Sequence, residues 1–397
     1  MARRVTTAPP KGPEAFTRDS DVHAQAQAAI LLGMGVQLRG DDLKTAARSA
    51  AAGQATDVLS AAADVAPAAG DDGSSDEFPI PRLAPTGERV PLEAARAVTE
   101  RVTGATFELA AAMPENRAIL AERVYGEPTP QNAAALIHAS LHSPDVLVRV
   151  AAAAAALPLS SDAEGAVEVL RAGTRNRDPL VREVAATALG RFSPEDPSLR
   201  RLRTPRGADL KASGALEVAA APERITVHGT WATNNAWWQP GGDFYKYLDT
   251  NVWNGLYRGT DHRWSGGYSD DARAAGAKKL VKWALSHSPT GTSLICHSHG
   301  ASVAMLASWD DAGITFDKLR FMSAPVHPSK YNVNFARVGS VSSVRVRMDL
   351  VLLADGSGSR FTDPRYDDHV LPIWFNHSAS HDPKVWEKYG VAALLKM

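Results

Sequence analysis

The distribution of aromatic residues divides this 397-residue chain into two parts that call for different packing. All nine Trp, seven of the eight Tyr and nine of the twelve His follow residue 222. The first 222 residues are instead rich in Ala, with uninterrupted runs such as Ala151–Ala156. Large rings and small methyl groups fill space differently, so this change in composition predicts two modules with separate cores.

The first module is predicted to be helical, because Ala, Leu and Gln dominate it and Gly, Asp and Pro interrupt its periodic segments. Helices are expected over 92–113, 132–141, 145–157, 163–171 and 179–190. Three Pro in an apolar-poor start predict disorder, and a Gly-Ser-Ser stretch followed by three more Pro predicts a linker. The expected order is therefore disorder over 1–20, a helical segment over 21–70, a linker over 71–90, a helical module over 91–205, a linker over 206–221 and the second module over 222–397.

Two helical segments of the first module repeat each other. Pro144-Asp145 leads into Val148-Arg149, and 33 residues later Asp178-Pro179 leads into Val181-Arg182. Pro can open a helix at no cost in hydrogen bonds, and Asp178 is expected to cap the next turn. The pattern resembles short HEAT repeats, although its period is shorter than usual and a third copy is missing. An ordinary Ala-rich bundle is the alternative, and either would serve as a scaffold or as a surface for a protein partner.

The second module contains a segment with a clear chemical signature. Residues 292–306 have the form of a strand, a sharp turn and a helix, and Ser298 lies at the turn in the sequence Cys296-His297-Ser298-His299-Gly300. Such an elbow exposes a serine hydroxyl at the sheet edge, in front of a helix N-terminus that favours developing negative charge. Small residues on either side let the backbone turn tightly.

This motif and its context resemble the α/β-hydrolase family, in particular its small lipase-like and esterase-like members. The resemblance covers residues 222–397 and implies a compact, mostly parallel sheet with flanking helices. The family has its nucleophile, acid and His in that chain order. Here Ser298 is followed by Asp349 after an alternating strand, and by His377 after a last strand. Each lies at the C-terminal end of a predicted strand, the edge where open α/β sheets place their sites.

The chemistry assigns a role to each of these residues. A serine is a poor nucleophile until a neutral imidazole takes its proton, so His377 is expected to be the base for Ser298. Asp349 would orient that imidazole and stabilise its charged form. The backbone N–H of His299 and that of Thr230, which follows a short strand ending in His-Gly, are the expected oxyanion donors.

Several alternatives stay open at these positions. His381 lies four residues after His377 and competes for the role of base, although Asp382 is expected to cap a helix starting at Pro383. Asp355 competes with Asp349, but an Asp-Gly pair is first of all a turn signal. His297 and His299 flank the serine, and their spacing in a tight turn points their side chains apart, so no metal site is expected.

Other segments of the second module have a structural and a functional interpretation. Cys296, at the buried end of a strand, is expected to be a small core residue rather than a nucleophile. Ser269 or Asp270 is expected to cap a helix that packs on the sheet. Trp231, Trp237 and Trp238 are predicted to line an acyl pocket, or else to form the core of their own loop.

The overall composition narrows the class of function. With 43 Lys plus Arg against 44 Asp plus Glu, the net charge of −1 offers no basic surface for nucleic acid. The single cysteine excludes a disulfide framework and a multi-cysteine zinc site. No segment is long and apolar enough to span a bilayer and no signal peptide is recognised, so a cytoplasmic location is expected.

Together these features predict a serine hydrolase that cleaves carboxylic esters without a cofactor. The aromatic content favours lipid or other apolar acyl esters as substrates. One alternative is a helical-repeat interaction protein whose hydrolase module is inactive or only binds. Another is an amidase or thioesterase that uses the same three residues.

Overall fold

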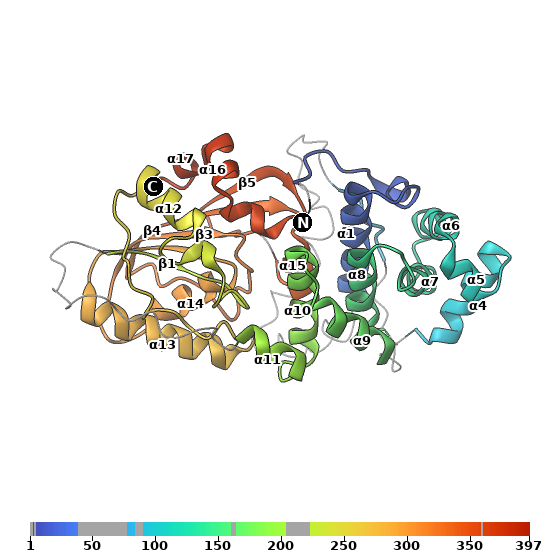
Figure 1. Cartoon of the computed structure of the whole chain (residues 1–397), viewed down its shortest axis with the longest axis horizontal. Helices are drawn as coiled ribbons and strands as arrows, with labels where there is room; N and C mark the ends of the chain where they lie inside the picture. Colours follow the sequence, from blue (N-terminus) through green and yellow to red (C-terminus); the bar gives the residue numbers. More distant parts are fainter. Residues whose placement is uncertain are drawn as a thin grey trace. The chain divides into compact units, whose positions relative to one another are not determined.

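The computed structural model describes residues 3, 5–38, 78–83, 90–159, 164–203, 223–358 and 360–397. The chain forms two compact units, each assembled from separate segments (Figure 1). The helical unit consists of Met1–Ser193, Met348–Gly358 and Ile373–Asn376, and the sheet unit of Pro194–Arg347, Ser359–Pro372 and His377–Met397. The predicted linker over 206–221 and most of the one over 71–90 lie outside the described residues.

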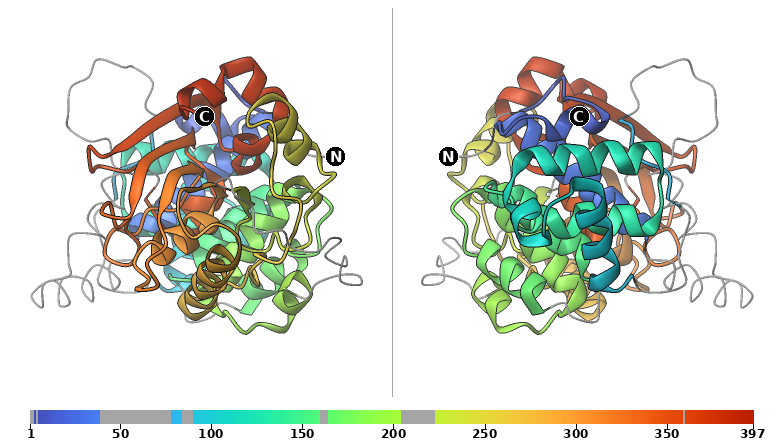
Figure 2. Two further views of the ribbon diagram at one scale, coloured as in Figure 1. Left: turned by 90° about the vertical axis from the view of Figure 1, so that its left-hand side faces the viewer. Right: turned by 90° about the vertical axis from the view of Figure 1, so that its right-hand side faces the viewer.

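The helical unit confirms that the Ala-rich half of the chain is helical (Figure 2). The polar groups that cap its helices include Asp145 and Asp178, whose carboxylates accept backbone N–H groups at the helix starts, as expected for Asp178. The Ala151–Ala156 run is buried, and its helix packs against the first long helix. The elements are η1 (Gly12–Phe16), α1 (Asp21–Gln37), α4 (Leu92–Thr103), α5 (Phe107–Ala112), α6 (Pro114–Gly126), α7 (Pro130–Ser140), α8 (Val146–Ala156), α9 (Glu164–Gly173), α10 (Pro179–Phe192) and α15 (Leu350–Asp355).

The structure differs from the sequence expectations at three places in this unit. The start of the chain, expected to be disordered, forms η1, and its Phe16 is only 3% exposed. The helix expected over 92–113 is broken at Gly104, which adopts the left-handed conformation that Gly tolerates best, and α6 was not expected. Residues 78–83, expected within a linker, bury three apolar side chains.

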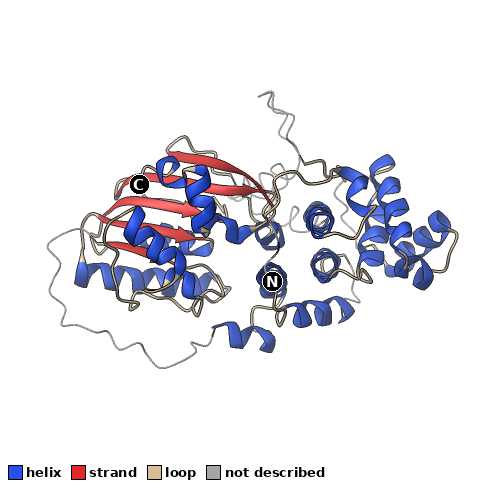
Figure 3. Cartoon of the chain, turned by 45° about the horizontal axis from the view of Figure 1, so that its top comes forward, coloured by secondary structure: helices blue, strands red, loops and turns tan. Residues whose placement is uncertain are grey.

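The sheet unit is built on parallel strands that end at one edge (Figure 3). The strand order is β1-β2-β3-β4-β5, and the pairs β1/β2, β2/β3 and β3/β4 are parallel. Val227 at the end of β1 pairs with Cys296 in β2, and Cys296 pairs with Phe321 in β3. The strands are β1 (Arg224–Val227), β2 (Thr292–His297), β3 (Phe316–Met322), β4 (Val338–Arg347) and β5 (Tyr366–Trp374).

Helices cover the strands and close a continuous apolar core. The core combines α13 and α14 side chains such as Leu280 and Val303 with strand residues such as Leu294 and Phe321. Ser269 caps α13 by accepting the N–H of Ala272, as predicted. The remaining elements of the unit are α11 (Pro197–Arg203), η2 (Ala236–Trp238), α12 (Asp243–Asn251), α13 (Asp270–His287), α14 (His299–Ala307), η3 (His377–His381), α16 (Pro383–Tyr389) and α17 (Val391–Leu394).

Candidate active site

Ser298 lies between β2 and α14 in the backbone conformation of a sharp elbow. Its φ is 51° and its ψ −134°, a conformation that costs a non-glycine residue of the order of 1–3 kcal/mol. Its N–H donates to the carbonyl of Met322 at the end of β3, at 2.9 Å. The strand, turn and helix predicted around Ser298 are therefore confirmed.

Two glycines allow the loop after β1 to close on this elbow. A Cβ at Gly300 would lie 2.5 Å from the carbonyl oxygen of Val227, which is too close for any real side chain. A Cβ at Gly229 would lie 2.8 Å from the Cβ of Ser298. The His228-Gly229 turn thus touches the serine directly and brings Thr230, the next residue, to the elbow.

The predicted oxyanion donors occupy suitable places at this contact. His299 is the first residue of α14 and directly follows Ser298. Thr230 follows Gly229 in the turn, and its buried Oγ1 has no hydrogen-bond partner among the described residues. Both N–H groups belong to segments that touch Ser298, as an oxyanion hole requires.

His228 fixes the orientation of the peptide that carries the Thr230 N–H. Its Nδ1 lies 2.9 Å from the carbonyl oxygen of Gly229, so this nitrogen is the donor. The ring is held by Trp238 and Trp264, at centroid distances of 4.6 and 5.6 Å. Because the Gly229 carbonyl and the Thr230 N–H share one planar peptide group, His228 sets the direction of that N–H. No motif in the sequence marks His228 for this role.

Both candidate bases lie against the residue that precedes the nucleophile. β5 ends at Trp374, so His377 opens η3 rather than ending the strand as expected. The ring of His297 lies 4.5 Å from that of His377 and 4.6 Å from that of His381.

The environment of His381 is unfavourable for a base. Its ring stacks on Trp237 at 4.3 Å, and burial lowers its pKa to about 3, with His377 adding to the effect. A base with so low a pKa takes up a proton poorly at neutral pH. Burial also lowers the pKa of His297 well below its usual value. The η3 helix thus brings both histidines to the elbow.

The candidate acids belong to the helical unit, and each has a local structural role. Asp349 follows β4 by two residues, is 1% exposed and caps α15 by accepting the N–H groups of Val351 and Leu352. Asp355 is the last residue of α15, and Gly356 ends the helix in the left-handed conformation, consistent with a turn signal. The pairing of Asp349 with His377 stays a prediction.

The two histidines that flank Ser298 point to different groups of rings, as predicted. His297 contacts Trp237, His377 and His381, whereas His299 meets Tyr268 and His327 at 5.8 and 6.2 Å. Tyr268 in turn stacks on Trp231 at 6.2 Å. Tyr268 and His327 were not found from the sequence, since they lie in loops without a motif.

The three Trp expected at the substrate occupy different environments. Trp237 is half-buried beside the histidines, and Trp231 is 8% exposed against Tyr268. Trp238 corrects the expectation: it is 1% exposed, and its indole N–H donates to the carbonyl of Ala232. Its ring supports His228 and His262 from within the unit and offers no surface to a substrate.

A cavity of about 420 Å³ opens in the sheet unit, on the loops that follow β3 and precede β5. Stacked rings of Phe361 and Tyr366 form part of its wall, and Tyr331 lines it from the side where His327 lies. His327 stacks on His299, so ring contacts run from Tyr331 at the cavity wall through His327 to the residue that follows Ser298.

Cys296 is completely buried, and burial raises the pKa of its thiol, as suits a core residue. Within the described part of the chain, no three His, Cys, Asp or Glu side chains are grouped so as to hold a metal ion. Nor does any described helix combine the length and apolar character needed to cross a bilayer. Comparison with known proteins finds no matching family, no similar curated protein and no similar solved structure.

Proposed function

We propose that this protein is a serine hydrolase that cleaves carboxylic esters through an acyl-Ser298 intermediate. The observation that carries the proposal is the strained elbow at Ser298, with φ 51°, held between a parallel strand and the start of a helix. Strain of this kind persists where the surrounding structure imposes it, and it is concentrated at functional sites. The order of strands, with Ser298 after β2, Asp349 after β4 and His377 after β5, further supports an α/β-hydrolase.

In this mechanism His377 takes the hydroxyl proton as Ser298 Oγ attacks the ester carbonyl. The N–H groups of Thr230 and His299 stabilise the oxyanion that forms on the carbonyl oxygen. His377 then gives its proton to the departing alcohol, which leaves the acyl group on Ser298. A water molecule, deprotonated by the same imidazole, releases the acid and restores the serine. Asp349 would hold the imidazole in the correct tautomer.

The rings on both sides of the elbow support an apolar acyl group as the substrate. Trp237 contacts His297 on one side of Ser298, and Tyr268, which stacks on Trp231, contacts His299 on the other. Apolar pockets with a few polar groups are typical of small-molecule sites. Short, medium and long acyl esters of one chromogenic alcohol, compared with the matching thioesters and anilides, would identify the class.

A fluorophosphonate probe tests the proposal, because it forms a covalent bond only with an activated serine. We expect the wild-type chain to be labelled at Ser298 and Ser298→Ala to remain unlabelled. Ser286→Ala is the control, since Ser286 is exposed on α13, its hydroxyl contacts only that helix, and its removal should not affect labelling. Absence of labelling in the folded wild-type chain would contradict the proposal and favour a module that only binds.

A further inference from the structure

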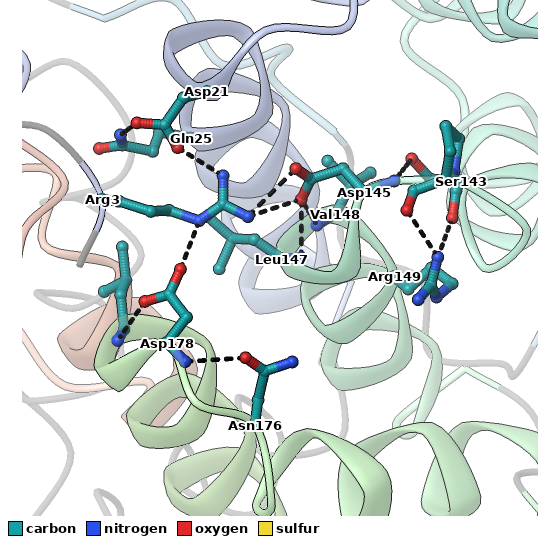
Figure 4. Close-up of polar contacts among 12 residues, drawn as sticks. Arg3, Asp21, Gln25, Ser143, Asp145, Leu147, Val148, Arg149, Asn176 and Asp178 are labelled. Atoms are coloured by element: carbon teal, nitrogen blue, oxygen red, sulfur yellow. Dashed lines mark hydrogen bonds and ion pairs between the residues drawn. The ribbon is translucent and has the colours of Figure 1, made fainter. Parts of the chain in front are cut away.

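Arg3 is held by three carboxylates of the helical unit (Figure 4). Its guanidinium nitrogens lie 2.7 Å from Asp21, 3.0 Å from Asp145 and 2.9 Å from Asp178, and the side chain is 12% exposed. Burial opposes the charge of Arg3, but the three carboxylates, led by Asp145, outweigh it and raise its pKa. Each of the three guanidinium nitrogens thus lies at ion-pair distance from a different carboxylate.

Two of the three carboxylates are the equivalent Asp residues of the 33-residue repeat. Asp145 accepts the N–H groups of Leu147 and Val148 at the start of α8, and Asp178 accepts the N–H of Leu180 at the start of α10. Each carboxylate therefore caps a helix and binds Arg3 at the same time. Arg3 joins the starts of α8 and α10 to Asp21 in the first turn of α1.

The segment that follows Arg3 binds the end of an edge strand. The carbonyl of Thr6 accepts the N–H of Trp374 at 2.8 Å, forming an antiparallel bridge to the last residue of β5. Thr6 is 3% exposed, and its hydroxyl donates to Gln25, which in turn donates to Asp21. The arm is therefore held at two points, Arg3 and Thr6, and both of these residues contact side chains of α1. His377 follows Trp374 by three residues.

We propose that residue 3 and residues 5–11, the N-terminal arm, form a strap that holds the end of β5 and so positions the segment carrying His377, with Arg3 as its lock. This inference rests on the proposed function, because it concerns the regulation of the same site. An edge strand has unpaired backbone groups, and the arm satisfies one of them at the last residue before the chain turns toward η3. Without Arg3 the three carboxylates would face one another, and their mutual repulsion would prevent the arm from binding there.

Hydrogen exchange in the full-length protein tests the strap directly. In Arg3→Ala we expect residues 370–378 to exchange at least tenfold faster than in the wild type, while the elbow at 292–300 is unchanged. Arg171→Ala is the control, because it removes an exposed ion pair with Glu168 from the same unit. The acidic hollow around Arg3, about 540 Å³, is open to small cations, so millimolar guanidinium should restore slow exchange in Arg3→Ala only.

A second variant covers the case in which Arg3→Ala does not fold. The double change Asp145→Asn with Asp178→Asn keeps both helix caps, since Asn caps as well as Asp, but removes two charges from Arg3. It should also accelerate exchange over 370–378. Unchanged exchange in both variants would overturn the strap.

Ester turnover then tests the link between the strap and the site. We expect Arg3→Ala to lower kcat about tenfold with little change in KM, because a displaced base slows chemistry more than binding, and guanidinium should restore kcat. Faster exchange with unchanged kcat would refute the link. If the wild-type chain has no hydrolase activity, the proposed function fails, and the exchange result alone still decides whether the arm holds β5.

Discussion

At the scale of single residues, the strain at Ser298 must be offset by its neighbours. A φ of 51° costs a serine of the order of 1–3 kcal/mol. The hydrogen bond from its N–H to Met322 and the close contact with Gly229 hold the residue in this conformation. The hydroxyl is thereby placed at the sheet edge before any substrate arrives, so little reorganisation remains for the reaction itself.

The identity of the base can be decided with two single variants. His377→Ala leaves the Ser298 hydroxyl without a base, so ester turnover should fall about 10⁶-fold. The loss should equal the loss in Ser298→Ala and the loss in the double variant, because the two residues act as one unit. His381→Ala removes a ring with a pKa of about 3 that stacks on Trp237, and it should leave kcat nearly unchanged. Turnover of one activated ester, with folding checked by circular dichroism, measures both. The reverse order of effects would make His381 the base.

The acid is tested in the same assay. Asp349→Asn keeps the cap of α15 but removes the charge expected to orient His377, so activity should fall roughly 10⁴-fold with little loss of stability. Asp355→Asn is the matched control on the same helix. If Asp355→Asn is the damaging change, the acid has been assigned to the wrong residue.

His228 offers a further test of the oxyanion hole. In His228→Phe the ring can still pack between Trp238 and Trp264, but the Gly229 carbonyl loses its donor and the Thr230 N–H its fixed direction. We expect kcat to fall about 10- to 100-fold, less than the loss of a whole donor, with little change in KM. The affinity for a boronate transition-state analogue should fall in parallel.

His262→Phe is the control for this experiment. His262 also packs on Trp238, but it hydrogen-bonds to Thr226 inside β1 and not to the oxyanion turn. The variant should lose stability and keep its kcat. Equal loss of kcat in both variants would mean that His228 acts only through general packing.

At the scale of elements, the contact between the β1 turn and the elbow depends on missing side chains. Gly300→Ala would place a methyl group 2.5 Å from the Val227 carbonyl and force the turn away from α14. We expect at least a 100-fold loss of ester turnover, because the Thr230 N–H moves with the turn. Gly165→Ala, at an open position in α9, should be neutral or stabilise the protein by up to about 1 kcal/mol. Thermal unfolding and turnover measure both, and a fully active Gly300→Ala would refute this contact.

The elements around the elbow could be predicted because their signals are local. A β-branched run, a small residue and an Ala-rich helix surround Ser298, and the caps at Ser269, Asp178 and Asp382 follow from chemistry within one turn. The start of the chain was predicted wrongly for the opposite reason. Its order depends on Thr6 and Arg3 binding residues far along the chain, which no local pattern reveals.

The candidate site was predicted in part for the same reason. The sequence indicated Ser298, and the order of later strands indicated His377, but no motif showed that both candidate bases would pack on His297. Trp237 and Trp238 are neighbours in sequence, yet one lies beside the histidines and the other is core. Their difference arises from the turn of η2, which points adjacent side chains in different directions.

At the scale of the whole molecule, buried histidines make stability depend on pH. Burial lowers the pKa of His228 to about 3 and that of His262 to about 4, against 6.5 in an unfolded chain. Below pH 6.5 the unfolded chain therefore binds protons that the folded one does not, and stability falls as the pH falls. Each histidine should cost about 1.4 kcal/mol between pH 7.5 and 5.5.

Urea unfolding at these two pH values measures the effect. The wild-type chain should lose roughly 3 kcal/mol from His228 and His262 together. His262→Phe should be less stable than the wild type at pH 7.5, but its loss of stability on acidification should be smaller than that of the wild type by about 1.4 kcal/mol. An unchanged pH dependence in this variant would show that His262 does not titrate on unfolding.

The division of the chain into units was the part least accessible from the sequence. The aromatic boundary near residue 222 predicts two consecutive modules, but α15 packs with α1 and α10, and residues 373–376 also belong to the helical unit. Composition indicates whether a residue is suited to an apolar core, but it does not show to which unit's core that residue belongs. Leu350 and Val351 are as apolar as any sheet residue, so nothing marks them as part of a helical core.

This interleaving has a consequence for how the protein is made. When α1 and α10 emerge from a ribosome, α15, which packs against both, has not yet been translated. Thr6 meets its partner Trp374 only when nearly the whole chain is present. The first half must therefore leave the ribosome with an apolar face uncovered. An N-terminal fragment that ends near residue 219 would expose that face permanently. We therefore expect chaperones that bind unfolded chains to retain this fragment and to release the complete chain.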